Sequence, residues 1–118
     1  MREIKFRAWD TGIKRMVEWN MVRRVEINNL ASDRMGWEFM QFTGLKNKNG
    51  KEIYEGDIVS WEFKETKAKT LKSVVLWSEY LNGFILGDSK DAKEGYNLVS
   101  TRQCLIIGNI YENPELMK

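Results

Sequence analysis

The stretch Tyr54-Glu55-Gly56-Asp57-Ile58-Val59 decides the fold, because a Gly-Asp pair directly precedes a run of strand-forming residues. Glycine permits the positive φ angle of a tight turn, and an aspartate in such a turn accepts hydrogen bonds from nearby backbone N–H groups. Beyond the pair, Val59, Trp61 and Phe63 fall on one face of a strand because side chains alternate. The stretch therefore predicts a turn that opens the first strand of a small β-barrel.

The residues before this stretch predict a β-hairpin and one further strand. From residue 4 to residue 19, apolar and charged side chains alternate, as expected of a half-buried strand pair. The turn falls at residues 10–12, where we expect Gly12 to take a positive φ. Residues 37–42 are aromatic-rich and strand-like. The irregular region between them contains three residues that suit a strand, Val22, Val25 and Ile27.

Turn signals and short apolar runs continue to the end of the chain. Asn49-Gly50 predicts a type I′ turn between Leu45 and Ile53. Residues 64–72 are expected to form a charged loop, and a second turn follows at Asn82-Gly83. Three further strands are predicted, at residues 73–77, 84–86 and 105–110. In the last of these, Gly108 indicates a bulge or a close backbone approach.

Together these elements predict a single domain that is mainly β. An N-terminal β region over residues 1–50 precedes a small SH3-like barrel over residues 51–118. Asn113-Pro114 reads as an N-cap followed by proline at the first helical position, so we expect a short helical turn at the C-terminus.

Composition excludes several function classes. The 118 residues include no histidine and one cysteine, Cys104, so a Cys/His zinc site cannot be assembled within one chain. The chain also lacks the side chain most used for acid–base catalysis near neutral pH. No apolar run is long enough to span a bilayer, and residues 1–6 do not resemble a signal peptide. We therefore expect a cytoplasmic, non-enzymatic protein without a cofactor.

Each candidate site also has a structural interpretation, and that interpretation is favoured. The glycines near residues 44–56 lack the spacing of a phosphate-binding loop and serve as turn residues. Asp57 could be catalytic, but is expected to accept backbone hydrogen bonds. The carboxylates of residues 88–94 do not follow a calcium-loop pattern. Cys104 lies beside an apolar strand and is predicted to be an inert core thiol.

Three segments resemble the YopX family of phage and prophage proteins. They are residues 2–10, residues 40–59 and the ending Ile107-Gly108-Asn109-Ile110-Tyr111-Glu112-Asn113-Pro114-Glu115-Leu116. The resemblance implies a mainly-β protein with an SH3-like barrel, encoded by a bacteriophage or prophage, with no assigned activity. The family-motif residues, to which we assign structural roles, are Gly44, Gly50, Gly56, Asp57, Gly108, Asn109, Tyr111, Asn113 and Pro114.

Two function classes remain. Five tryptophans are many for one small core, so we expect one or two to be exposed and to support self-association. The first class is therefore a homo-oligomeric interaction module that also binds a phage or host protein. The alternative is weak nucleic-acid binding, which the net charge of +2 does not favour. Its candidate residues are Arg23, Arg24, Lys46, Lys48, Lys51, Lys64, Lys67, Lys69 and Lys72.

Overall fold

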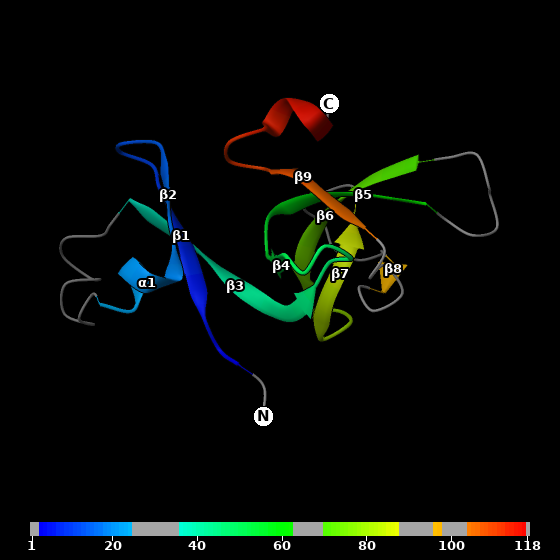
Figure 1. The fold of residues 1–118 in the computed structure, drawn as a ribbon, viewed down its shortest axis with the longest axis horizontal. Coiled ribbons are helices and arrows are strands. Elements are labelled where there is room, and N and C mark those ends of the chain that lie inside the picture. The colour runs from blue at the N-terminus through cyan, green and yellow to red at the C-terminus, as the bar shows by residue number, and fades with distance from the viewer. Residues whose placement is uncertain (1–2, 25–35, 63–69, 88–95, 98–103, 118) are drawn as a thin grey trace. The chain divides into compact units, whose positions relative to one another are not determined.

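Figure 1 shows the fold in a computed structural model, which describes residues 3–24, 36–62, 70–87, 96–97 and 104–117. Most described residues lie in strands, which confirms the mainly-β prediction. The chain divides into two compact units, Met1–Phe42 and Thr43–Lys118. The predicted division lay between residues 50 and 51; the structural one lies earlier, and strand β4 (Glu52–Tyr54) pairs with β3 (Trp37–Lys46).

The first unit is built on a β-hairpin, as predicted. Strand β1 (Phe6–Asp10) pairs antiparallel with β2 (Arg15–Val17) on one side. On its other side it pairs antiparallel with the first part of β3 (Trp37–Lys46). Ala8 lies opposite both Val17 and Phe39 and is completely buried, so β1 is the central strand of this unit.

The hairpin turn differs from its prediction. The residue with a positive φ is Lys14 (φ 55°), and Gly12 does not have one. The reason is the Asp10 carboxylate, whose Oδ1 accepts hydrogen bonds from the backbone N–H groups of Gly12 (2.9 Å) and Ile13 (3.2 Å). These bonds hold a longer loop, and the left-handed residue moves to its end. The other oxygen, Oδ2, accepts a hydrogen bond from Trp37 Nε1 at 3.0 Å.

The strand prediction at Val22 is wrong. Helix α1 (Trp19–Val22) is a single turn in which the Glu18 carbonyl accepts hydrogen bonds from the N–H groups of Met21 and Val22. Val22 is buried, so tertiary packing rather than local propensity decides its conformation. The other two residues of that prediction, Val25 and Ile27, lie outside the described residues.

The second unit contains a five-stranded antiparallel sheet in the order β8-β7-β6-β5-β9. Its strands are β5 (Asp57–Glu62), β6 (Thr70–Ser78), β7 (Gly83–Gly87), β8 (Tyr96–Asn97) and β9 (Leu105–Asn109). Before them, β4 (Glu52–Tyr54) pairs with the end of β3, and the predicted C-terminal turn is the 3-10 helix Pro114–Met117. The described strands curl without closing (Figure 1), and the SH3-like barrel stays a prediction.

Two details of this sheet bear on the sequence predictions. Strand β6 begins at Thr70, so Lys72 lies in a strand rather than in the predicted charged loop. Strand β9 contains the bulge predicted near Gly108. Ile58 pairs with Gly108 whereas the next residue, Val59, pairs with Ile106, so Ile107 is the extra residue.

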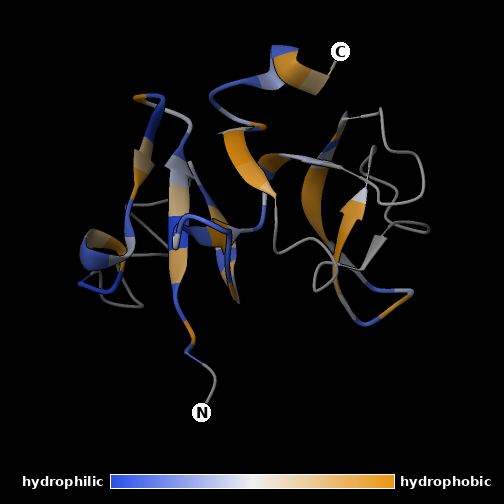
Figure 2. Ribbon diagram, turned by 45° about the vertical axis from the view of Figure 1, so that its right-hand side comes forward, coloured by the Kyte–Doolittle hydropathy of each residue, from blue (hydrophilic) through white to orange (hydrophobic). Residues whose placement is uncertain are grey.

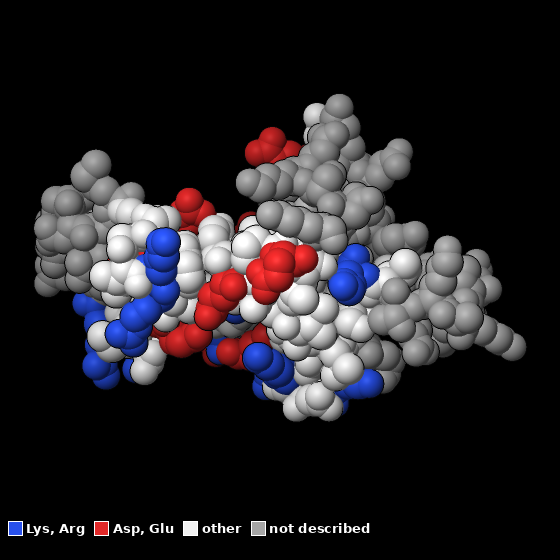
Figure 3. Space-filling view, turned by 90° about the horizontal axis from the view of Figure 1, so that it is seen from above, with Lys and Arg blue, Asp and Glu red and all other residues white. Residues whose placement is uncertain are grey.

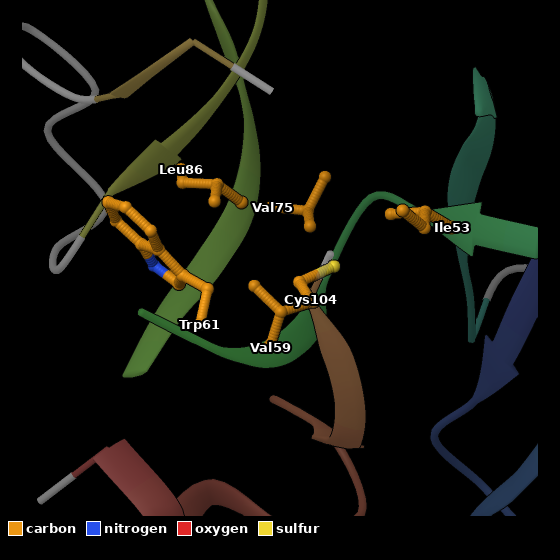
Figure 4. Packing of buried hydrophobic residues seen from close by; sticks show 6 residues of the cluster. All are labelled: Ile53, Val59, Trp61, Val75, Leu86 and Cys104. Atoms are coloured by element: carbon orange, nitrogen blue, oxygen red, sulfur yellow. The ribbon is translucent and has the colours of Figure 1, made fainter. Parts of the chain in front are cut away.

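One buried apolar cluster of the second unit lies on one face of this sheet, and Ile58, Val74 and Ile85 are buried on the other. Figure 2 shows hydrophobic residues concentrated along its strands, and Figure 4 shows how they pack. The buried cluster consists of Ile53, Val59, Trp61, Val75, Leu86 and Cys104. Trp61 Nε1 donates a hydrogen bond to Ser73 Oγ at 3.1 Å, which satisfies its polar atom inside the core. Val59 and Trp61 share the core face as predicted.

Candidate functional site

Of the motif glycines near residue 50, Gly50 and Gly56 lie at turns as predicted, whereas Gly44 lies within strand β3, so the prediction of a turn there is wrong. Gly44, Gly50 and Gly56 all have positive φ angles, of 89°, 81° and 85°. The prediction of a type I′ turn at Asn49-Gly50 is wrong. Such a turn needs a positive φ at both residues, and only Gly50 has one. Asn47 organises the loop instead. Its Oδ1 accepts hydrogen bonds from the N–H groups of Asn49 (2.9 Å) and Lys51 (3.0 Å).

Gly56 and Asp57 form the junction that opens β5. The Gly56 N–H donates to the Val75 carbonyl at 2.8 Å, and its carbonyl accepts from the Ile110 N–H at 2.9 Å. Asp57 is buried, and its Oδ2 accepts a hydrogen bond from the Tyr54 N–H at 2.8 Å. This backbone bond is the one predicted for an aspartate in a Gly-Asp turn.

Hydrogen bonds of two asparagine side chains, Asn109 and Asn113, hold the turn of the C-terminal motif. Asn109 Oδ1 accepts hydrogen bonds from the N–H groups of Tyr111 (3.0 Å) and Glu112 (2.8 Å), and Asn109 Nδ2 donates to Glu112 Oε1 (3.0 Å). Asn113 Oδ1 accepts from the Asn109 N–H at 3.2 Å. Asn113 was predicted to cap the following helix, but its side chain reaches back to Asn109. Pro114 begins the 3-10 helix as predicted.

One exposed group of apolar side chains lies where β6 turns into β7. We call it the hairpin end; its residues are Trp77, Tyr80, Leu81 and Phe84. Trp77 is 46% exposed, Tyr80 67% and Leu81 55%, whereas Phe84 is partly buried against the core. The Trp77 and Phe84 rings meet edge to face, with centroids 5.1 Å apart and planes at 77°. Trp77 is the only exposed tryptophan among the described residues, in line with the expectation of one or two.

The candidate cations that the structure describes are divided between the two units. Arg23 and Arg24 are exposed in the first unit, and Lys46, Lys48 and Lys51 are exposed around the Asn47 loop in the second. Lys72 is exposed on β6, where its Nζ donates to the Leu116 carbonyl at 3.5 Å. The remaining candidates, Lys64, Lys67 and Lys69, lie outside the described residues, as do residues 88–94. Figure 3 shows both signs of charge on the face that it draws.

Cys104 is completely buried, and burial raises the pKa of its thiol, so it stays protonated at neutral pH. Within the described part of the chain, no group of three or more carboxylate or cysteine side chains is placed to hold a metal ion. Nor does that part contain a helix long and apolar enough to cross a membrane.

A family model described as YopX protein matches residues 5–118. The chain belongs to the YopX family. The match includes residues of both structural units, from the N-terminal hairpin to the C-terminal turn at Asn109. The resemblance to the YopX family that the sequence indicated is therefore confirmed.

A solved structure resembles this YopX family member over its full length. It is the crystal structure of protein EF1440 from Enterococcus faecalis, with a TM-score of 0.68 and 27% sequence identity over 100% of both chains. None of the curated proteins compared matches the chain. The family match identifies the chain as a YopX member, and the likeness to EF1440 shows that the two proteins share a fold.

Proposed function

We propose that this chain is a non-enzymatic protein-interaction module that associates with itself. The observation that carries the proposal is the exposure of Trp77, which is 46% accessible although its ring meets that of Phe84 edge to face. A tryptophan left half in water loses much of the free energy that its burial would contribute. Exposed aromatic and aliphatic side chains that gather in one place are typical of interaction sites rather than of a monomer surface.

Three features of the motif segments and of the core beside them support structural roles for these residues and thus a non-enzymatic module. Asn47 and Asn109 use their side-chain oxygens to hold turns, and Asp57 accepts a backbone hydrogen bond while buried. The Cys104 thiol is buried and protonated, which leaves it a poor nucleophile. Asn47, Asp57, Asn109 and Cys104 thus each have a packing or hydrogen-bonding role.

We further propose that the protein is encoded by a bacteriophage or prophage, acts in the cytoplasm of the bacterial host and binds a phage or host protein there. Membership of the YopX family supports this setting, which the sequence resemblance implied. Cell fractionation after prophage induction tests it: recovery with the envelope fraction would contradict the cytoplasmic assignment.

Self-association is tested by chemical cross-linking of two differently tagged copies expressed together, followed by affinity purification of one copy, with and without nuclease treatment before the cross-linker is added. We expect the second copy to be retained under both conditions. Retention that is lost with nuclease would instead support the alternative function, in which nucleic acid bridges the copies. No retention at concentrations of tens of micromolar, a range that includes weak protein pairs, would contradict self-association.

The alternative, weak nucleic-acid binding, rests on one observation. Lys46, Lys48 and Lys51 are all exposed around a loop that Asn47 holds in place. Because Glu52 follows directly and the net charge is only +2, the positive field there is small. We therefore rank this function second.

A further inference from the structure

We propose that the hairpin end is the surface at which two copies of this chain meet, and that they form a symmetric, reversible dimer. The proposal rests on the self-association proposed above and adds the surface, the symmetry and the strength of the contact.

The position of Trp77 in the sheet explains why this surface is open. Val75 pairs with Leu86, and both belong to the buried core cluster. Two residues further along, Trp77 pairs with Phe84, so these rings stand on the same face as the core pair. The apolar face of the sheet therefore extends beyond the buried core to Trp77, beside the loop that joins β6 and β7.

The hairpin end is also ordered before any partner arrives. Phe84 packs against the core cluster and supports the Trp77 ring from its edge. In the loop, the Leu81 N–H donates a hydrogen bond to Ser78 Oγ at 3.1 Å, and Asn82 takes the left-handed conformation (φ 52°) that closes the turn. Figures 1 and 2 show this loop as a short projection at the end of β6 and β7. A contact made here therefore costs little backbone conformational entropy.

Charge favours a second copy as the occupant. From Trp77 to Phe84 the sequence contains a single charged residue, Glu79. Nucleic acid would find no cation in this stretch, and a strongly charged protein would find only one carboxylate to pair with. A second copy presents the same apolar side chains with one carboxylate. When the same patch of two copies meets across a twofold axis, the assembly is complete as a dimer.

The exposed area sets the strength of this contact. From the usual size of these side chains, Trp77, Tyr80 and Leu81 together offer about 350 Å² per copy. A stable interface needs roughly 800 Å² from each partner, so the hairpin end alone supports only a weak pair. We therefore expect a dissociation constant on the order of tens of micromolar rather than nanomolar.

Sedimentation of the full chain over a range from about 5 to about 500 micromolar, which brackets this constant, tests the proposal. Leu81→Asp places a carboxylate in the contact while leaving the exposed loop free to fold. Ile13→Asp is the matched control, because Ile13 is equally exposed (63%) but lies in the first unit. We expect the wild type and Ile13→Asp to shift from 13.9 kDa toward twice that mass, and Leu81→Asp to bind itself at least tenfold more weakly.

The other outcomes separate the two proposals. A Leu81→Asp variant that dimerises like the wild type would overturn the hairpin end as the contact and leave self-association standing. Loss of association in Ile13→Asp alone would also overturn it, since the contact would then lie in the first unit. Assemblies larger than two would contradict the twofold contact, and a wild type that stays monomeric throughout would overturn both proposals. Melting curves of both variants show whether each is folded.

Discussion

Asn113 fills the space in which a side chain at position 108 would stand. A Cβ atom built on Gly108 would lie 2.5 Å from Asn113 Oδ1 and 2.8 Å from Asn113 Cγ. The glycine is therefore required by contact, although its φ is not positive. The bulge in β9 and the return of the C-terminal turn meet at this point.

Gly108→Ala should destabilise the domain by about 1 to 3 kcal/mol, because the added methyl group forces Asn113 out of its hydrogen bond with Asn109. Thermal unfolding followed by circular dichroism should show a melting temperature lower by roughly 5 to 15 °C. Gly83→Ala is the control, since a Cβ there meets nothing closer than the Leu81 carbonyl oxygen at 3.9 Å. Equal melting temperatures for the two variants would show that Asn113 can move away from an added methyl group at position 108 without loss of stability.

Gly56→Val should lower the free energy of unfolding by about 2 to 4 kcal/mol, because a β-branched residue is strained at a φ of 85°. The backbone cannot relax, since the Gly56 N–H and carbonyl are both bonded to other segments. Gly50→Val provides the comparison: its φ is 81°, but a Cβ there meets nothing within 4 Å. We expect the smaller loss at Gly50, measured by urea unfolding. A larger loss at Gly50 than at Gly56 would contradict the role of the junction.

Cys104 should resist alkylation in the folded protein. Burial raises the pKa of its thiol above that in the unfolded chain, so the folded state keeps the proton longer. The contribution of the protonated thiol to folding stability is fully present below the pKa of the thiol in the unfolded chain, about 8.5. It is lost as the pH rises toward the pKa of the folded state. A small alkylating reagent at pH 8 should label Cys104 only in denaturant.

The same pKa shift has a counterpart in stability measurements. Above the unfolded pKa of the thiol, the unfolding free energy of the wild type should fall more steeply with pH than that of Cys104→Ala, which has no thiol to titrate. Parallel slopes for the two proteins, or rapid labelling without denaturant, would show that the thiol is accessible in solution.

Nucleic-acid binding should be weak and sensitive to salt. If Lys46, Lys48 and Lys51 contact phosphates of duplex DNA, the logarithm of affinity should fall with the logarithm of salt with a slope of about −2.7 at most. Fluorescence anisotropy with a labelled duplex measures this slope. Submicromolar binding at physiological salt, lost when Lys67, Lys69 and Lys72 are changed to Glu, would reverse the ranking of the two functions.

The sequence predicted best where a strand alternates or a turn is held by one local side chain. The β1–β2 hairpin, the opening of β5 at Asp57 and the C-terminal 3-10 helix all follow from such signals. Asp57 itself was placed correctly because its hydrogen bond reaches only to Tyr54, three residues away. Local signals of this kind need no knowledge of the rest of the fold.

The errors arise where distant residues decide the backbone. Gly12 was expected to take the positive φ of its turn, but the Asp10 carboxylate and its bond to Trp37 settle that loop. The single turn of α1 is too short to show a helical period, and the burial of Val22 holds it. The sequence predicted how many tryptophans would be exposed but not that Trp77 would be one of them, because burial depends on the tertiary packing around each ring.

The extra residue Ile107 in β9 limits what any association can become. Strand β9 lies at the edge of its sheet, and the two-residue β8 lies at the other end of the strand order. A regular edge could template a strand from a neighbouring molecule, and a chain of such additions grows into a fibre. The bulge interrupts the spacing that an incoming strand would need. Growth by strand addition is thereby discouraged, and contacts between copies depend on side chains, which can saturate at a finite assembly.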